Sequence, residues 1–417
     1  MQVEQRKESE ELLHNICCLP QAVAAGTSSR RSLTPFRLSW EGTDQVAEDE
    51  FSYILNPDGS IRWFFPTDTP FPTHLGLYNS AHWKARLYKW GTRQAFRLGQ
   101  QKRLFSGQFW LKNKAQLPLF RLLSTVDHDS YAVFTGTAGE NRKSVVALSK
   151  DRQITHFLKI AHQAKSASLL RQEAYTLGVL NQTSWEHWVL PQARQSADLP
   201  AIILTNIRPR VQQDQSVWSR SHSLALHEMY HRFAQPSRWN RLHCAEEVQA
   251  HLAHILQTEP KDPSLDKHQI DRLRALLKKL HRSLVPDAAL HHALAHADFT
   301  PWNMYRSHQG LHVYDWELAR EDLPLFYDFF HFHYQGGVLL KKYPTDRIHR
   351  EIQRALQRPD MKQLIQHYGA DIQFYHRLYL LYVISYYLRI YLDEPKVHMQ
   401  VHWLLATWET AMENVLL

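Results

Sequence analysis

The order of strand-like and helix-like segments is the feature that most constrains the fold of this 417-residue chain. Short apolar runs with β-type composition come first, at 131–135, 144–148, 156–161 and 201–205. One segment with helical spacing, 168–180, lies among them, and from about residue 210 onward the pattern is helical. Strands followed by helices predict a segregated α+β architecture.

The clearest helix of this region is predicted at 266–284, where Ile270, Leu273 and Leu277 share one face. The C-terminal segment 361–417 is rich in aromatic residues and is predicted to form further helices. Its apolar run 378–388 is shorter than the roughly 20 residues that span a bilayer. We therefore expect a buried helix there.

The N-terminal quarter has a different pattern. Residues 1–30 are predicted to be a mobile start, and the runs 51–55 and 60–65 flank a Pro-Asp-Gly turn typical of a β-hairpin. Residues 80–125 are predicted to be mixed, mostly helical and basic. The expected organisation is an N-terminal extension at 1–125, a small strand-rich lobe at 126–208 and a helical lobe at 209–417.

The composition indicates which class of protein and which cellular compartment to expect. Apolar residues make up 44% of the chain, which is ordinary for a folded protein. Three cysteines cannot form a disulfide framework, and the N-terminus lacks the apolar core of a signal peptide. We expect a cytoplasmic protein, with peripheral association at a membrane as a further option.

Charge is unevenly distributed. The net charge is +8, yet no acidic residue occurs between Asp68 and Asp127. Ten basic residues lie in that window, interleaved with aromatic residues: Lys84, Arg86, Lys89, Arg93, Arg97, Lys102, Arg103, Lys112, Lys114 and Arg121. Segment 82–121 could contact an anionic membrane surface or an acidic glycan, or be an ordinary solvated face. Nucleic acid is the less favoured partner.

The residues best suited to catalysis or metal binding lie in two short segments. These are 294–303, Leu-Ala-His-Ala-Asp-Phe-Thr-Pro-Trp-Asn, and 313–317, Val-Tyr-Asp-Trp-Glu. Pro301 disfavours a continuous helix, so a strand running into a loop would turn Asp298 and Asn303 toward one pocket. Gly310 would allow a tight hairpin that brings Asp315 beside Asn303. An amide oxygen and a carboxylate suit magnesium, and a second carboxylate could orient an attacking hydroxyl.

This segment resembles the aminoglycoside phosphotransferase and choline kinase superfamily, which has the protein-kinase-like fold. The matching residues are His296, Asp298, Asn303, Asp315, Trp316 and Glu317, and Asp328 resembles a further family aspartate that opens a helix. Ala297 departs from the glycine usual in the family. The resemblance implies a bilobal kinase-like fold, with a small antiparallel-sheet lobe and a large helical lobe.

The resemblance also implies a role for several of these residues in phosphoryl transfer. Asp298 would position or deprotonate the acceptor hydroxyl, and His296 would support the loop. Asn303 and Asp315 would bind Mg²⁺, and the phosphoryl donor would be ATP or GTP. The acceptor would be a hydroxyl of a small molecule, a sugar or a cell-surface glycan.

The small lobe of such a protein should supply a lysine and a helix glutamate to the nucleotide. Lys159 lies in a predicted strand and Glu173 in the following helix, while Lys150 and Lys165 are rivals outside the centre of a strand. Gly136 and Gly139 could form a phosphate-contacting turn. Thr205 and Asn206 fall where the resemblance places the adenine-contacting segment.

Two alternatives remain open from the sequence. A metal-dependent hydrolase could use His291, His292, His296 and Asp298 to hold a transition metal, with His331 and His333 nearby in sequence. If His291 and His292 lie on a strand, however, they point to opposite faces. The other alternative is an inactive kinase-like module that binds nucleotide or a partner without catalysis.

Overall fold

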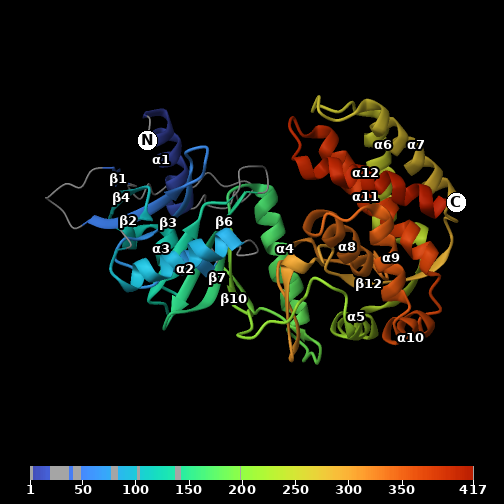
Figure 1. Ribbon diagram of the computed structural model, residues 1–417, viewed down its shortest axis with the longest axis horizontal. Coiled ribbons are helices and arrows are strands. Elements are labelled where there is room, and N and C mark those ends of the chain that lie inside the picture. The colour runs from blue at the N-terminus through green and yellow to red at the C-terminus, as the bar shows by residue number, and fades with distance from the viewer. Residues whose placement is uncertain are drawn as a thin grey trace. The chain divides into compact units, whose positions relative to one another are not determined.

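The computed structural model describes residues 3–18, 37–40, 48–76, 83–100, 104–136, 142–197 and 199–416. The chain divides into two compact units (Figure 1). Unit 1 consists of 1–182 and 191–206, and unit 2 of 183–190 and 207–417. Strands dominate the first unit and helices the second, so the predicted α+β class is confirmed.

In the described part of the chain, the strands of unit 1 form one nine-stranded sheet in the order β1-β4-β2-β3-β5-β6-β7-β10-β9. The order follows antiparallel pairings throughout. The strands are β1 (Leu38–Ser39), β2 (Glu48–Leu55), β3 (Ile61–Pro66), β4 (Gly107–Lys112), β5 (Ser130–Phe134), β6 (Lys143–Lys150), β7 (Gln153–Ala161), β9 (Ala193–Gln195) and β10 (Ala201–Thr205).

The N-terminal strands belong to this same sheet, which differs from the separate extension expected at 1–125. The predicted hairpin is confirmed as β2–β3, but β3 also pairs with β5, with Trp63 opposite Phe134. The expected boundary at 125/126 therefore falls inside one continuous sheet. The pairing joins segments far apart in sequence, which a local pattern cannot reveal.

The core of unit 1 lies on one face of the sheet. Helix α1 (Val3–Cys18) and helix α3 (Pro118–Leu123) contribute buried apolar residues to it. Leu13, Ile16 and Cys17 of α1 are fully buried there, at helical spacing. Residues 3–18 are thus helical rather than the mobile start that their charge suggested, because one apolar stripe packs against the sheet.

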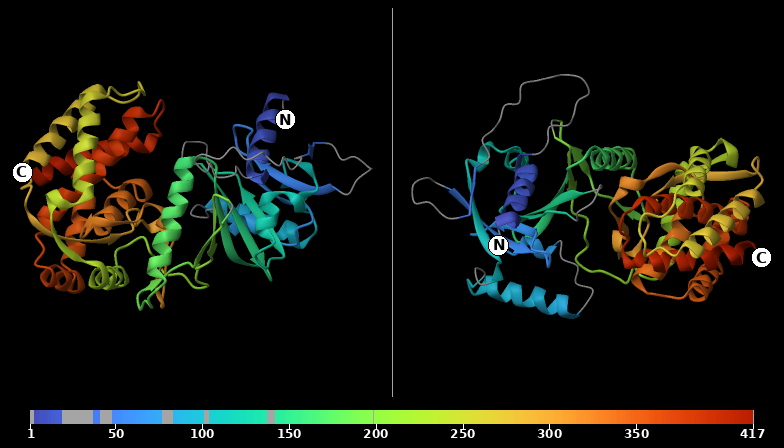
Figure 2. Two further views of the ribbon diagram at one scale, coloured as in Figure 1. Left: turned by 180° about the vertical axis from the view of Figure 1, so that it is seen from behind. Right: turned by 90° about the horizontal axis from the view of Figure 1, so that it is seen from above.

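The opposite face of the sheet carries helix α2 (Trp83–Arg97) and helix α4 (Ala164–Leu180). A smaller apolar cluster of Trp63, Phe65 and Ala132 lies on this face. Residues of β7 alternate between the faces, so Leu158 and Ile160 point to the main core while Lys159 points toward α4. Figure 2 shows α4 as the long green helix beside the strands.

Unit 2 is mostly helical. Its helices are α5 (Arg220–Phe233), α6 (His243–Gln257), α7 (Lys267–Ser283), α8 (Tyr327–Gln335), α9 (Thr345–Leu356), α10 (Pro359–His367), α11 (Ile372–Asp393) and α12 (Met399–Leu416). Helix α11 contains the long apolar run and packs against α6, α7, α8 and α12, as a buried helix should. No described helix combines the length and apolar character that crossing a bilayer requires.

Two small three-stranded sheets position the site of unit 2. One has the order β11-β12-β15, from β11 (Gln235–Arg238), β12 (Ala289–Ala295) and β15 (Arg320–Pro324). The other has the order β13-β14-β8, from β13 (Met304–Ser307), β14 (Gly310–Val313) and β8 (Trp188–Val189). Strand β8 pairs in parallel with β14, so 183–190 belongs to unit 2.

Candidate active site

The loop after β12 carries the central residues. Strand β12 ends at Ala295, and the chain then turns through His296, Ala297 and Asp298 into a short 3₁₀ turn at Pro301–Asn303. Proline suits the first position of such a turn, because it lacks an N–H and presets the backbone angle. The predicted strand-into-loop arrangement is therefore confirmed.

Ala297 has a left-handed backbone conformation, with φ of 64°. A residue with a Cβ pays roughly 1–2 kcal/mol for this conformation, whereas glycine adopts it freely. This explains physically why glycine would suit the position and why alanine is still accommodated. The surrounding contacts hold the alanine there.

Asp328 supplies the strongest of those contacts. It lies in the first turn of α8, and its carboxylate accepts N–H bonds from His296 (2.7 Å) and Ala297 (3.0 Å). The side chain is buried, and its burial raises the pKa of the carboxyl above the usual value, although His296 and the two N–H donors oppose the shift. Asp328 thus fastens the loop to the start of α8.

Asp298 is held by two side chains. Asn303 Nδ2 donates to one carboxylate oxygen at 2.7 Å, and His331 Nε2 lies 3.3 Å from the other. The Asp298 side chain is still about a quarter exposed, at 26%. Its carboxylate is therefore oriented by the protein while part of it remains reachable from solvent.

His331 was weighed in sequence only as a possible metal ligand, and its contact with Asp298 was missed. It follows Asp328 by three residues in α8, so the two side chains lie on the same side of the helix. That spacing is the signal that could have revealed it. One helical turn thus fastens the loop backbone through Asp328 and orients Asp298 through His331.

His296 lies beneath the loop. Its Nδ1 accepts the N–H of Asp298 at 3.2 Å, and its Nε2 contacts the Tyr314 carbonyl at 3.0 Å. These partners require the proton on Nε2, which donates to the carbonyl. The ring is buried, and its centroid lies 4.6 Å from that of the Trp316 ring at an interplanar angle of 58°. His296 therefore joins the loop to the 314–316 segment and does not touch the Asp298 carboxylate.

The hairpin β13–β14 brings the next carboxylate into place. Met304 pairs with Val313, and just beyond that pair the N–H of Tyr314 donates to the Asn303 carbonyl at 3.1 Å. Asn303 and Asp315 therefore lie at neighbouring ends of two paired strands, as the sequence predicted. Gly310 makes the turn possible, because its φ is 120° and a Cβ would come within 2.5 Å of the His187 carbonyl oxygen.

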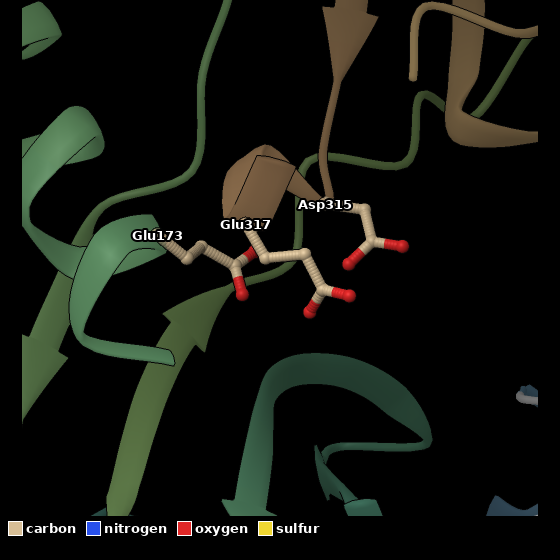
Figure 3. A group of neighbouring side chains, drawn as sticks. All are labelled: Glu173, Asp315 and Glu317. Atoms are coloured by element: carbon tan, nitrogen blue, oxygen red, sulfur yellow. The ribbon is translucent and has the colours of Figure 1, made fainter. Parts of the chain in front are cut away.

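Asp315 and Glu317 follow β14 directly. Asp315 has a φ of 71°, and Glu317 lies on the 3₁₀ turn Trp316–Leu318 that comes next. Figure 3 shows both carboxylates extending from this segment. Trp316 anchors it, since its ring is fully buried and its Nε1 donates to the Val313 carbonyl at 3.0 Å.

The oxygen donors of this segment suit a hard divalent cation. Asn303 uses Nδ2 to contact Asp298, which leaves Oδ1 accepting no hydrogen bond from the described residues. An amide oxygen and a carboxylate are ligands that Mg²⁺ accepts, with water completing its shell. Asn303 and Asp315 therefore fit the predicted metal-binding pair.

The histidines proposed for a transition-metal site have other surroundings. His292 Nδ1 contacts the Glu321 carbonyl at 2.9 Å, and the His291 ring packs 5.4 Å from the Tyr368 ring. Both lie on β12, where neighbours point to opposite faces. Among the described residues, no group of three possible ligands includes either of them. Within the described part of the chain, the histidines and aspartate of this alternative are therefore not gathered into one ligand set.

Unit 1 brings together the other predicted pair. Lys159 Nζ lies 2.8 Å from both carboxylate oxygens of Glu173. Glu173 is fully buried, and only 13% of the Lys159 side chain is exposed. The rival Lys150 instead forms an exposed pair with Asp127 at 2.9 Å. Lys159 is thus the lysine of a buried strand–helix ion pair.

The remaining predicted positions lie at the edges of unit 1. Gly136 has a φ of 81°, and a Cβ there would lie 2.1 Å from the Lys143 carbonyl oxygen, so glycine is required. Gly139 lies outside the described residues. Thr205 Oγ1 accepts the Gln192 N–H at 2.8 Å, and Asn206 Nδ2 donates to the Ile154 carbonyl at 2.7 Å.

Comparisons with known proteins complete the description. Neither protein-family models nor curated proteins gave a match. Solved structures that match include the ADP-bound aminoglycoside phosphotransferase APH(2'')-Ib, at 11% identity, a TM-score of 0.43, and coverage of 71% of this chain and 97% of that one. Spectinomycin phosphotransferase APH(9)-Ia matches at 14% identity, a TM-score of 0.44, and 71% and 97% coverage.

The choline kinase LicA from Streptococcus pneumoniae matches at 14% identity, a TM-score of 0.40, and coverage of 71% of this chain and 96% of that one. These matching structures are two aminoglycoside-type phosphotransferases and a choline kinase. The likeness is one of fold.

Proposed function

We propose that the protein transfers a phosphoryl group from a magnesium-bound nucleoside triphosphate to a hydroxyl of a small molecule. The observation that carries this proposal is the set Asp298, Asn303 and Asp315, gathered by a loop and a hairpin of unit 2. Phosphoryl transfer depends mainly on positioning and charge stabilisation, and these are the groups that provide both. The donor would be ATP or GTP.

Asp298 is the group proposed to act on the acceptor. Its two contacts, to Asn303 and His331, direct the carboxylate while part of it stays exposed. It would accept the proton of the acceptor hydroxyl as the oxygen bonds to the γ-phosphorus and the bond to the nucleoside diphosphate breaks. His296 and Asp328 act on this step only by holding the loop.

Asn303 Oδ1 and the Asp315 carboxylate are proposed to hold the metal. Magnesium, when bound, neutralises negative charge on the phosphate oxygens. Lys159 is proposed to contact the nucleotide phosphates, with Glu173 fixing the direction of its ammonium group. Gly136, Gly139, Thr205 and Asn206 are proposed to lie along the nucleotide.

The decisive experiment combines nucleotide binding with turnover. Thermal unfolding with ATP or GTP, with and without Mg²⁺, should show stabilisation that requires the metal. Nucleotide consumption is then followed over a panel of aminoglycosides, choline, sugars and other alcohols. Asp298→Asn preserves shape and can still bond Asn303, so it should bind nucleotide but lose activity about 10²–10⁴-fold. Asp287→Asn, on the surface of the same unit, is the matched control.

The metal and phosphate contacts need their own variants. Asp315→Asn should remove the metal dependence of binding, and Lys159→Arg should weaken nucleotide binding while keeping a cation beside Glu173. Lys150→Arg, at the exposed pair with Asp127, serves as the control. Nucleotide binding without turnover on any acceptor would favour the inactive module. Absence of nucleotide binding together with tightly held zinc would overturn the proposal.

A further inference from the structure

Helix α2 (Trp83–Arg97) presents apolar side chains to solvent. Trp83 is 68% exposed, Leu87 58%, Trp90 62% and, just after the helix, Leu98 73%. At 100° per residue, positions 83, 87, 90 and 98 fall on one face. A contiguous exposed apolar patch of this kind marks an interaction surface in a protein that otherwise buries such residues.

The opposite face of α2 attaches the helix to unit 1. Thr92 is buried, and the Phe96 ring lies 6.3 Å from His74 and 6.2 Å from Phe105. Phe65 of β3 contacts both of those rings. In Figure 2, right-hand view, α2 runs along the margin of unit 1 with the strands on one side. The helix is therefore held by one face while its aromatic and aliphatic face points outward.

Basic residues border the apolar stripe. Arg86, Arg93 and Arg97 are exposed, and on the helical wheel they lie together beside Trp90. The helix contains no Asp or Glu. The outward surface thus combines an apolar stripe of tryptophan and leucine with a row of permanent positive charges.

This combination distinguishes among anionic partners. An acidic glycan is bound through charge and hydrogen bonds, so it would satisfy the arginines but leave Leu87 and Leu98 in water. A second copy of this chain would place two positive helices against each other. An anionic phospholipid surface matches both components, because acyl chains accept leucine, tryptophan prefers the interface, and lipid headgroups attract arginine.

We propose that α2 lies flat on anionic phospholipid membranes, with Trp83, Leu87, Trp90 and Leu98 inserted at the headgroup boundary and Arg86, Arg93 and Arg97 contacting headgroups. The inference does not depend on the proposed kinase activity. It would place unit 1 at a membrane surface.

The test is co-sedimentation of the full-length protein with phosphatidylcholine vesicles, with and without phosphatidylserine. Binding should require phosphatidylserine and weaken as salt increases. Each arginine contributes about fivefold to such binding, so Arg86→Gln/Arg93→Gln/Arg97→Gln should weaken it roughly a hundredfold. Lys278→Gln/Lys279→Gln/Arg282→Gln removes the same charge from exposed positions of α7 and should leave binding unchanged.

The apolar stripe is tested separately with Trp83→Ala/Trp90→Ala. Both rings are mostly exposed, so the unfolding temperature should change by no more than a few degrees, whereas vesicle affinity should fall at least about tenfold. Quenching of tryptophan fluorescence by brominated lipid should fall with it. No binding to anionic vesicles at low salt would overturn the proposal. So would binding that ignores the tryptophans, or binding to heparin with none to vesicles.

Discussion

Asp328→Asn should uncouple the loop from α8 without touching a substrate-binding group. The Asp328 carboxylate accepts two backbone N–H bonds, from His296 at 2.7 Å and from Ala297 at 3.0 Å. Asparagine keeps one acceptor oxygen and presents an NH₂ group at the other position. One backbone N–H would then face a donor and lose its bond, at a position buried from bulk solvent.

The magnitude follows from burial. A hydrogen bond to a charged group contributes about 1.5–3 kcal/mol, and a buried unsatisfied donor costs about 1–3 kcal/mol. The amide also removes the desolvation cost of a buried carboxylate, which offsets part of the loss. We expect a net destabilisation of about 2–4 kcal/mol and a loss of phosphotransfer larger than the loss of nucleotide binding.

Urea unfolding measures the stability part. Asp266→Asn is the matched control, because this exposed N-cap of α7 accepts one N–H, from His268, and asparagine caps equally well. The deficit of Asp328→Asn should widen in acid, because the raised pKa of Asp328 means that the folded wild type takes up a proton more readily than the unfolded chain, whereas asparagine does not titrate. Unchanged stability and activity at neutral pH would refute the reasoning.

Two further predictions concern backbone strain and buried histidines. Ala297→Gly should stabilise the protein by up to about 1 kcal/mol, because the φ of Ala297 is 64°. Ala295→Gly, in strand β12, is the control and should destabilise the protein. Shifts of the urea midpoint in the same direction for both variants would contradict the strain argument. Burial lowers the pKa of His222, His333 and His376 to about 3. The unfolded chain therefore binds protons at these rings below about pH 6.5 while the folded protein does not. The free energy of unfolding should fall by about 4 kcal/mol per pH unit for the three rings together as pH drops below that value. Equal urea midpoints at about pH 7 and pH 5 would show that these rings are not neutral in the folded state.

Much of the site could be predicted because its geometry is local. A hairpin whose turn contains Gly310 brings Asn303 and Asp315 together. Because only about a dozen residues separate the two, the local sequence is enough to predict that they lie close. Lys159 and Glu173 meet because a strand leads directly into the helix that packs on it. In both cases periodicity and turn residues contain enough information.

The contacts that hold the 296–298 loop could not be predicted from such local sequence patterns. Asp328 was noticed only through a family resemblance, and the contact of His331 with Asp298 was missed, because both depend on where α8 packs. Ala297 could be identified as unusual from sequence, but its positive φ is a property of the folded loop.

The sequence by itself determined the α+β class, the loop and hairpin that carry Asp298, Asn303 and Asp315, and the basic, aromatic character of the segment around α2. Only the tertiary structure decided that β1–β4 share a sheet with β5–β10, and that α2 turns its apolar stripe outward. The reason is physical: turns and helix periodicity arise from neighbouring residues, whereas strand order and the facing of a helix depend on distant partners competing for the same surface.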